Sequence, residues 1–324
     1  MNLRTRFFAV ITILLLANLC AAQNSQAVEI SFDPQPADVR EEAFNALSNR
    51  LVLANEQGQQ QKRFIKRINF GASWIPENGD DGLGIADAKA SFTFALPGPK
   101  WEALGSSYFL ISPSFKYSNV QWNRSTPFPD SLYNTGLNIT WMQPINERWS
   151  TMLNATPSYS GDGKADDYFF RCPLIIGANW TPNAKWKVLF GVAYLDRGDI
   201  PVIPFGGFTY APNDDWKFEC MAPQPRIARR LAGWSDSQVD RWCYLGGGFG
   251  GDTWAISSVG DRSDIAMYRE YSVLLGYESI RKPGTFQWNA EIAYLFGRKV
   301  EFEYETQSDY KPNDSLALRV RVSF

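Results

Sequence analysis

From residue 67 onward, apolar and polar residues alternate along the chain with a period of two. The alternation is most regular at the end, where positions 316, 318, 320, 322 and 324 are apolar and the positions between them are small or polar. Successive side chains of a strand point to opposite faces, so one face of this strand suits lipid and the other suits water. A soluble strand can alternate in the same way, but it rarely places a residue such as Phe324 at its frayed end. The pattern predicts the closing strand of a transmembrane β-barrel.

The same period predicts strands throughout residues 67–324, and most of them are roughly 9–13 residues long, the length that a tilted strand needs to cross a bilayer. Strands of soluble sheets are shorter, with about five or six residues. The expected segments are 67–74, 88–96, 107–118, 132–142, 148–160, 168–180, 185–195, 202–210, 215–222, 240–256, 265–278, 285–298 (or on to 305) and 314–324. The expected lipid-facing residues include Trp288, Ala290, Ile292 and Tyr294, and also Tyr271, Val273, Leu275 and Tyr277.

Three connectors, at 141–149, 180–186 and 210–216, share one pattern, in which Pro and Asn form a tight turn between aromatic residues. Pro fixes φ and Asn tolerates unusual turn geometry, while the rings suit the membrane interface. These connectors predict short periplasmic turns with an aromatic girdle. The expected interface aromatics are Trp141, Trp149, Trp180, Trp186, Tyr210 and Trp216.

The strand count follows from the turns, because both ends of a barrel wall face the periplasm and the number of strands is then even. The pattern gives thirteen segments, and the directions of 215–222 and 240–256 require one inward strand between them. Residues 226–231, which follow Pro223 and Pro225, are the candidate. We therefore predict an all-β, antiparallel barrel of fourteen strands, or of twelve if two weak segments near its N-terminal end lie outside the wall.

The N-terminus reads as a secretory signal peptide, with Arg4 and Arg6 before an apolar run at 7–19 and small residues after it. Cleavage is expected after Ala22 (domain 1–22) or as late as residue 27. Lipidation of Cys20 is disfavoured by the large Leu19 before it. Residues 28–66 are expected to be a periplasmic segment and linker with a helix at 38–56 that either plugs the pore or, more simply, is a loose leader; the barrel domain is 67–324.

Composition agrees with a barrel rather than with membrane helices. Mean hydropathy is −0.29, and no stretch beyond the leader approaches the ~20 apolar residues of a membrane helix. Aromatic residues make up 15% of the chain, with 12 Trp, as expected if rings lie at both interfaces. A net charge of −2 gives no basic surface for nucleic acid.

The chain contains no histidine. This excludes nucleophiles activated by histidine and metal sites built on imidazole. Asp162 with Asp166 or Asp167 could form a carboxylate pair, but residues 160–167 read as a polar outer loop. We therefore expect no enzyme activity, no catalytic residue, no cofactor and no metal.

Three cysteines, at 172, 220 and 243, would remain after signal cleavage. A Cys220–Cys243 bridge is compatible with export, but an odd count favours separate thiols.

On the closing strands, charged residues share the parity that faces the lumen, so opposite charges are expected to meet across a polar interior. The candidate lumen charges are Glu291, Glu301, Glu303, Arg319 and Arg321. Such groups set the field of a channel constriction or, alternatively, stiffen a closed barrel as ion pairs.

Three further motifs have open interpretations. Arg226, Arg229 and Arg230 either contact an anion or the phosphates of an outer-leaflet lipid, or form the polar side of a short strand. The glycine-rich run 246–251 lacks the context of a nucleotide loop, so it marks a bend of the wall or a groove under an inserted loop. The charged connector at 196–199 reads as a solvated turn, with a ligand loop as the alternative.

Six stretches carry a resemblance to an uncharacterised family of predicted outer-membrane barrels of planctomycete type, a domain of unknown function. They are 194–200, 204–216, 223–227, 242–251, 294–298 and 318–324. The resemblance covers roughly 65–324 and implies the fold and an envelope location, and it implies no activity. For a Gram-negative outer-membrane barrel we expect membrane lipids and the outer-membrane assembly machinery as partners. From the residues, we expect either a passive or weakly selective channel for small solutes or a structural or surface-interaction barrel with an occluded lumen.

Overall fold

The computed structural model describes residues 65–79, 81–101, 105–122, 128–165, 170–194, 202–221, 224–257, 263–282, 286–304 and 308–324. The chain divides into two units, 1–33 and 34–324, and all described residues belong to the second. The expected signal peptide and the expected helix at 38–56 lie outside the described residues.

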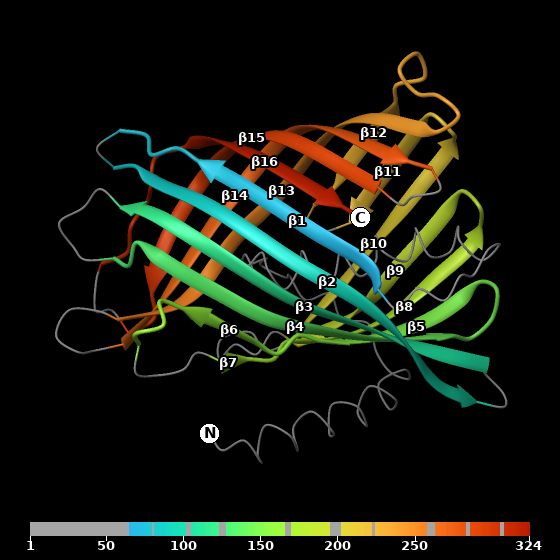
Figure 1. The fold of residues 1–324 in the computed structure, drawn as a ribbon, viewed down its shortest axis with the longest axis horizontal. Helices are drawn as coiled ribbons and strands as arrows, with labels where there is room; N and C mark the ends of the chain where they lie inside the picture. Colours follow the sequence, from blue (N-terminus) through green and yellow to red (C-terminus); the bar gives the residue numbers. More distant parts are fainter. Residues whose placement is uncertain are drawn as a thin grey trace, which may run out of the picture. The chain divides into compact units, whose positions relative to one another are not determined.

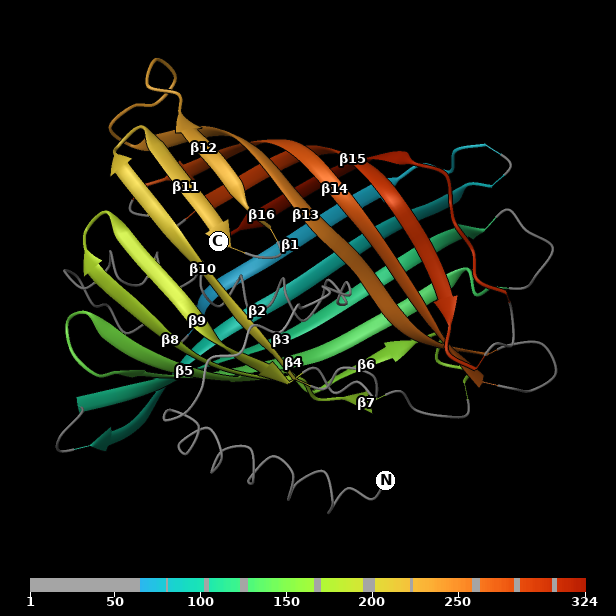
Figure 2. The same ribbon diagram turned by 180° about the vertical axis from the view of Figure 1, so that it is seen from behind.

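The described residues form one antiparallel sheet that closes into a barrel (Figures 1 and 2). The strands are β1 (Ile65–Ile75), β2 (Leu83–Trp101), β3 (Gly105–Trp122), β4 (Ser131–Pro144), β5 (Trp149–Ala155), β6 (Ser158–Gly161), β7 (Phe170–Arg171), β8 (Leu174–Asn183), β9 (Trp186–Tyr194), β10 (Val202–Asn213), β11 (Trp216–Met221), β12 (Arg226–Arg230), β13 (Val239–Ser257), β14 (Ser263–Arg281), β15 (Phe286–Phe302) and β16 (Ser315–Ser323).

The wall contains fourteen strands, as predicted. Neighbouring strands pair from β1 to β12, β12 pairs with β13, and β16 returns to β1. β5 and β6 together form one wall strand, interrupted at Thr156 and Pro157, and β7 and β8 form the next, interrupted at Cys172 and Pro173. Proline cannot donate a ladder hydrogen bond, which explains both breaks. The missing inward strand is β12. The N-terminal segments pair within the wall as β1 and β2, so the twelve-strand alternative is wrong.

The barrel has a turn end and a loop end, and the turn end carries the short connectors and the paired backbones of Ile68 and Phe324. In each predicted turn the Asn side chain accepts hydrogen bonds from the backbone N–H groups two and three residues later, at 2.9–3.1 Å. These residues are Asn146, Asn183 and Asn213. Asp236 makes the same turn before β13 with its carboxylate, a fourth copy that the sequence pattern did not reveal.

The circumference of the wall is smaller at the loop end. There β6 pairs with β4 and, through Gly161 and Ala255, with β13. Nine strands (β1–β4, β6 and β13–β16) therefore close a second ring, and the five strands β8–β12 end below it. A barrel of about eight strands is just filled by side chains, whereas wider barrels can enclose a lumen. The nine-strand ring at the loop end is close to the size that side chains fill, whereas the fourteen-strand wall is wide enough to enclose a lumen.

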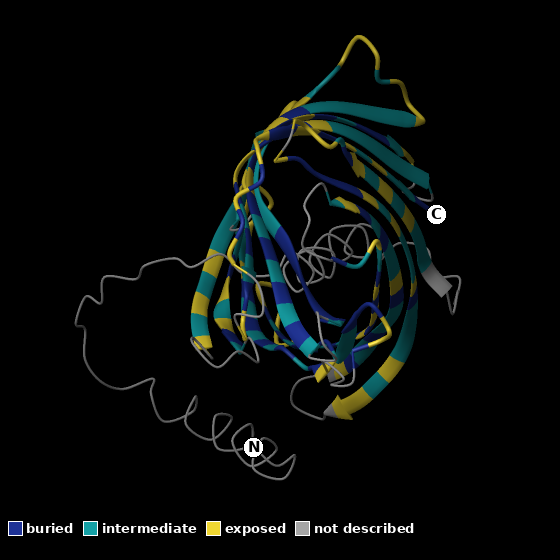
Figure 3. Ribbon diagram, turned by 90° about the vertical axis from the view of Figure 1, so that its left-hand side faces the viewer, coloured by how far each residue is buried: buried dark blue, intermediate teal, exposed yellow. Residues whose placement is uncertain are grey.

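Buried and exposed residues alternate along the long strands, as Figure 3 shows from the end of the barrel. On β14 and β16 the outward side chains are apolar and about half exposed, among them Val273 (50%), Leu275 (52%) and Leu318 (48%). Trp288, Ala290, Ile292, Tyr294, Tyr271 and Tyr277 share this outward parity through their register partners. Among the described residues, no helix is long and apolar enough to cross a membrane.

A β-bulge reverses the parity of β15. Gly297 has φ +60° and the β14–β15 register shifts there, so odd-numbered residues face inward before it and even-numbered residues after it. A bulge of this kind places glycine in the left-handed region. The expectation that Glu301 and Glu303 face the lumen with Glu291 is therefore wrong, because a constant period of two was assumed along the whole strand.

Candidate functional site: the interior cavity

The wide part of the barrel encloses a cavity of about 240 Å³. Its wall is the inner face of β1–β3 and β13–β16, together with residues 224–226 at the start of β12. Glu291, Arg319 and Arg321 lie on this wall, whereas Glu301 lies on the opposite face of the sheet, paired with Arg269 at 3.2 Å and with Lys299. Glu303 is exposed beyond the end of β15.

Opposite charges form pairs on the wall of the cavity. Arg319 of β16 donates a hydrogen bond to Glu270 of β14 at 2.8 Å, across the intervening β15. On the other side, the ammonium of Lys116 lies 2.7 Å from Asp252 and 3.5 Å from Asp87. A charge that is removed from bulk water loses hydration, and a partner of opposite charge offsets part of that loss.

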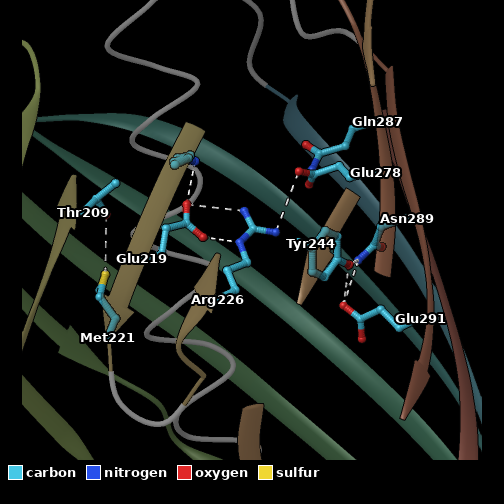
Figure 4. Close-up of polar contacts among 10 residues, drawn as sticks. Thr209, Glu219, Met221, Arg226, Tyr244, Glu278, Gln287, Asn289 and Glu291 are labelled. Atoms are coloured by element: carbon cyan, nitrogen blue, oxygen red, sulfur yellow. Dashed lines mark hydrogen bonds and ion pairs between the residues drawn. The ribbon is translucent and has the colours of Figure 1, made fainter. Parts of the chain in front are cut away.

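Arg226 stands at the centre of a second group of charges (Figure 4). Its guanidinium donates to Glu219 of β11 and lies 3.7 Å from Glu278 of β14, while Lys217 lies 2.5 Å from Glu219. The guanidinium also lies 5.0 Å from the ring centroid of Tyr244, within cation–π range. Arg226 therefore joins three strands of the inner wall.

Tyr244 continues this group toward the closing strands (Figure 4). Its hydroxyl donates to Glu291 at 2.6 Å and accepts from the amide of Asn289 at 3.1 Å. Gly276 makes room for the ring, because a Cβ at that position would lie 2.2 Å from Tyr244. The sequence offered no signal for this contact, which depends on the register between β13, β14 and β15.

The three arginines of β12 have different environments. Arg226 and Arg230 face inward, and Arg230 lies 2.5 Å from Asp240. Arg229 faces outward and stacks over the ring of Trp216 at 5.3 Å. The three guanidinium groups therefore do not converge on one site. The observed arrangement is that of a short strand with a polar side, and contact with an anion or a lipid phosphate stays a prediction.

Apolar side chains fill the interior at the loop end. The cluster includes Leu83, Leu132, Trp254, Ile256 and Phe302, each at most 5% exposed. The cavity reaches only its lower edge, at residues such as Ile75 and Ile85. This packing is what a ring of nine strands allows.

Arg298 is buried within this loop-end packing, and the sequence analysis did not select it. Its guanidinium donates to the hydroxyl of Tyr268 at 2.8 Å and to the backbone carbonyls of Leu83 at 2.7 Å and Asn313 at 2.9 Å. It faces inward because it follows the bulge at Gly297. Gly297 directly before Arg298 was the one signal in the sequence, and by itself it does not separate a bulge from a regular strand.

A closed ring of hydrogen bonds lies on the inner face of β4 and β5, and the sequence analysis did not predict it. Asn138 and Asn154 each donate to a threonine hydroxyl and accept from the other one, at 2.8–3.2 Å, through Thr140 and Thr156. All four side chains are at most 6% exposed. Because each of these four side chains both donates and accepts a hydrogen bond within the ring, their polar groups can be buried.

The two polar connectors of the sequence analysis have separate outcomes. Asp162 accepts hydrogen bonds from Ser257, Lys164 and Ala165. Burial opposes its ionisation, but these hydrogen bonds outweigh burial and hold the pKa of Asp162 below its usual value. Residues 166–167 and 196–199 lie outside the described residues. Cys172, Cys220 and Cys243 are free thiols.

Aromatic side chains form a belt around the outer surface at the turn end. Trp149 stacks on Trp180 at 5.8 Å, Trp186 on Tyr210 at 4.4 Å, and Trp216 on Phe218 at 6.0 Å between ring centroids. Above this belt the outward residues are apolar up to the level of Tyr271 and Phe296. Only a closed sheet with such a band satisfies its backbone in lipid. The protein is an outer-membrane β-barrel.

Comparisons with known proteins found solved structures of similar architecture but no family for this chain. No family model and no curated protein matches the chain. The translocator domain of the autotransporter NalP from Neisseria meningitidis is 9% identical, with 89% of this chain and 98% of that chain covered and a TM-score of 0.33. A bacterial polysaccharide outer membrane secretin is 9% identical (80% and 97% covered, TM-score 0.37). The COG4313 outer membrane channel from Pseudomonas putida F1 is 10% identical (80% and 94% covered, TM-score 0.36).

Proposed function

We propose that the barrel is a passive, weakly selective channel for small solutes. The observation that carries this proposal is the charged cavity inside the fourteen-strand part of the wall, about 240 Å³ in volume. Pockets for drug-sized ligands are larger, about 300–1,000 Å³, so only small solutes fit without rearrangement of the wall. The cavity residues are paired charges rather than a convergent set around one ligand, which suits passage better than tight binding.

Weak selectivity follows from the balance of charge along the cavity. Its wall contains six basic and five acidic side chains, and pairs such as Arg319–Glu270 neutralise each other locally. Rings of one sign would make a pore strongly ion-selective, whereas mixed pairs give a weak preference. We therefore expect small neutral solutes and small ions of either sign to pass.

Liposome swelling tests the proposal directly. Purified full-length protein in liposomes should admit small sugars and amino acids at rates that fall steeply with solute size. Heat-modifiable gel mobility on the same sample confirms that the barrel is folded. Swelling no faster than in protein-free liposomes, with folded protein present, contradicts the channel.

The apolar cluster at the loop end favours a second candidate, a structural barrel with an occluded lumen. Residues such as Leu132 and Ile256 are 0% exposed there and leave the cavity without an axial outlet among the described residues. This candidate predicts no flux at any solute size. The swelling experiment therefore separates the two.

A further inference from the structure

The charges that line the cavity are divided between two halves of its wall. The half formed by β16 and β1–β3 carries one acidic residue, Asp87, and five basic residues, which are Arg67, Lys89, Lys116, Arg319 and Arg321. The half formed by β12–β15 carries one basic residue, Arg226, and four acidic residues, which are Asp252, Glu270, Glu278 and Glu291. Among the described residues, the cavity therefore has a basic half and an acidic half.

The two exceptions do not change the sign of either half. Arg226 donates to Glu219 and lies 3.7 Å from Glu278, so two carboxylates surround its guanidinium (Figure 4). Asp87 lies 3.5 Å from the ammonium of Lys116. Each exception is compensated by neighbouring charges of the opposite sign, which reduces its effect on a solute in the cavity.

Two ion pairs connect the halves, and both have the same orientation. Arg319 of β16 donates to Glu270 of β14 at 2.8 Å, and the ammonium of Lys116 on β3 lies 2.7 Å from Asp252 on β13. In both pairs the base belongs to the basic half and the carboxylate to the acidic half. The strands β2 and β3 lie on the opposite side of the barrel from β13 and β14 (Figures 1 and 2). The two pair dipoles therefore share a direction across the cavity and reinforce each other.

A field of this kind acts on a solute according to how the charge of that solute is distributed. A solute with a single charge is attracted by one half of the wall and repelled by the other. A zwitterion turns its ammonium toward the acidic half and its carboxylate toward the basic half, and it gains from both. Wall charges that already have a partner still contribute, because the solute responds to the sum of all charges around it.

We infer that the cavity selects small zwitterions, the class of free amino acids, over uncharged solutes of the same size. The inference rests on the proposed channel and names its preferred substrate class. The ammonium and the carboxylate of an amino acid lose hydration when they enter, and the two halves of the wall offset part of that loss. Because pairs such as Arg319–Glu270 also hold each other, the solute is bound weakly enough to leave, as passage requires.

Liposome swelling with two isomers tests this inference. Alanine and lactamide contain the same atoms and are similar in size, but only alanine is a zwitterion at neutral pH. Sieving by size therefore treats them alike. Their rates of entry into liposomes with full-length protein, each corrected for the rate in protein-free liposomes, should differ several-fold in favour of alanine. Glycine and glycolamide are a second pair of isomers and should show the same order.

Two matched double variants test whether the preference comes from the cavity charges. Arg319→Gln with Glu270→Gln removes one pair between the halves without changing the net charge, and it should lower the ratio of the alanine rate to the lactamide rate toward one. Arg269→Gln with Glu301→Gln removes a pair of the same residue types on the outer face of the sheet and should leave the ratio unchanged. Heat-modifiable gel mobility reports the folding of each variant.

Lactamide that enters as fast as alanine would overturn the inference and leave the channel. Equal ratios in the two double variants would also overturn it. Lys116→Gln with Asp252→Asn removes the other pair between the halves and serves as the test if the first double variant does not fold. If neither isomer enters faster than in protein-free liposomes, with folded protein present, the channel itself is contradicted and the inference fails with it.

Discussion

The carboxylate of Asp162 accepts two hydrogen bonds from Ser257, one from its backbone N–H at 2.8 Å and one from its hydroxyl at 2.6 Å. Together with the backbone bond to Ala255, this contact closes the nine-strand ring at the loop end. A carboxylate in an outer loop, 95 residues from its partner, thus determines where the barrel wall narrows.

Replacement of Asp162 should loosen this closure without unfolding the wide part of the barrel. Hydrogen bonds to charged groups contribute about 1.5–3 kcal/mol each, and Asp162→Ala removes both from Ser257. Hydrogen exchange of residues 255–257 should therefore become faster, while β14–β16 near the turn end stay protected. Asp236→Ala, which removes the same type of turn at the other end, is the control and should leave 255–257 unchanged. Equal exchange in wild type and Asp162→Ala contradicts the closure.

The pH dependence of this contact has a defined sign. The pKa of Asp162 is lowered from 3.8 because burial is outweighed by the hydrogen bonds that favour the carboxylate. The contact thus contributes its full stability above the unfolded value and loses it as the pH falls through the lower folded pKa. The protection factor of residues 255–257, which corrects for the intrinsic pH dependence of exchange, should be constant at neutral pH and fall only below about pH 4, and Asp162→Asn should abolish this step. A step near pH 6 would contradict the assignment.

Gly297 should be intolerant of a side chain. Its φ of +60° lies in the left-handed region, and a Cβ would lie 2.9 Å from the ring of Tyr271. Gly297→Val should cost about 1–3 kcal/mol and should displace Arg298 from its contacts at the loop end. The denaturant midpoint of unfolding in detergent measures this loss. Gly206→Val, on an outward position where a Cβ has no contact closer than 3.4 Å, should change the midpoint little.

The inner group around Arg226 should be more sensitive than the outward arginine beside it. Arg226→Met leaves Glu219, which is 3% exposed, without its guanidinium partner. Loss of one member of a buried pair costs about 3–5 kcal/mol. Arg229→Met removes only an exposed stacking contact and should be nearly neutral. The double variant Arg226→Met with Glu219→Gln should recover part of the loss; additive losses in urea unfolding would contradict a coupled pair.

The sequence was sufficient for the wall because the lipid-facing parts of the strands obey the same period of two, from which β15 departs only at Gly297. The directions of the short turns even located β12, although Arg226–Arg230 is only five residues long and weakly apolar. The lumen was less predictable. Gly297 adds one residue to β15 and turns Glu301 outward, and no property of residues 291–303 by themselves separates this bulge from a regular strand.

The narrowing of the wall at the loop end is a second feature that the pattern could not supply. It depends on five strands that end below the β6–β13 contact, and strand length in a barrel is determined by pairing with neighbours rather than by local sequence. The glycine-rich run 246–251 lies on the wall of the cavity, and Gly251 within it has φ +147°. The narrowing follows only from the register of β6 on β4 and on β13.

The reversal potential across a planar bilayer, with a salt gradient and full-length protein, tests the central claim most directly. The account predicts discrete conductance steps with weak ion selectivity. Arg319→Gln leaves the carboxylate of Glu270 in the cavity without its partner and should shift the reversal potential toward cation preference. Glu301→Gln changes a charge on the outer face and should leave it unchanged. Folded protein without conductance steps, or equal reversal potentials for wild type and Arg319→Gln, would contradict a channel through this cavity.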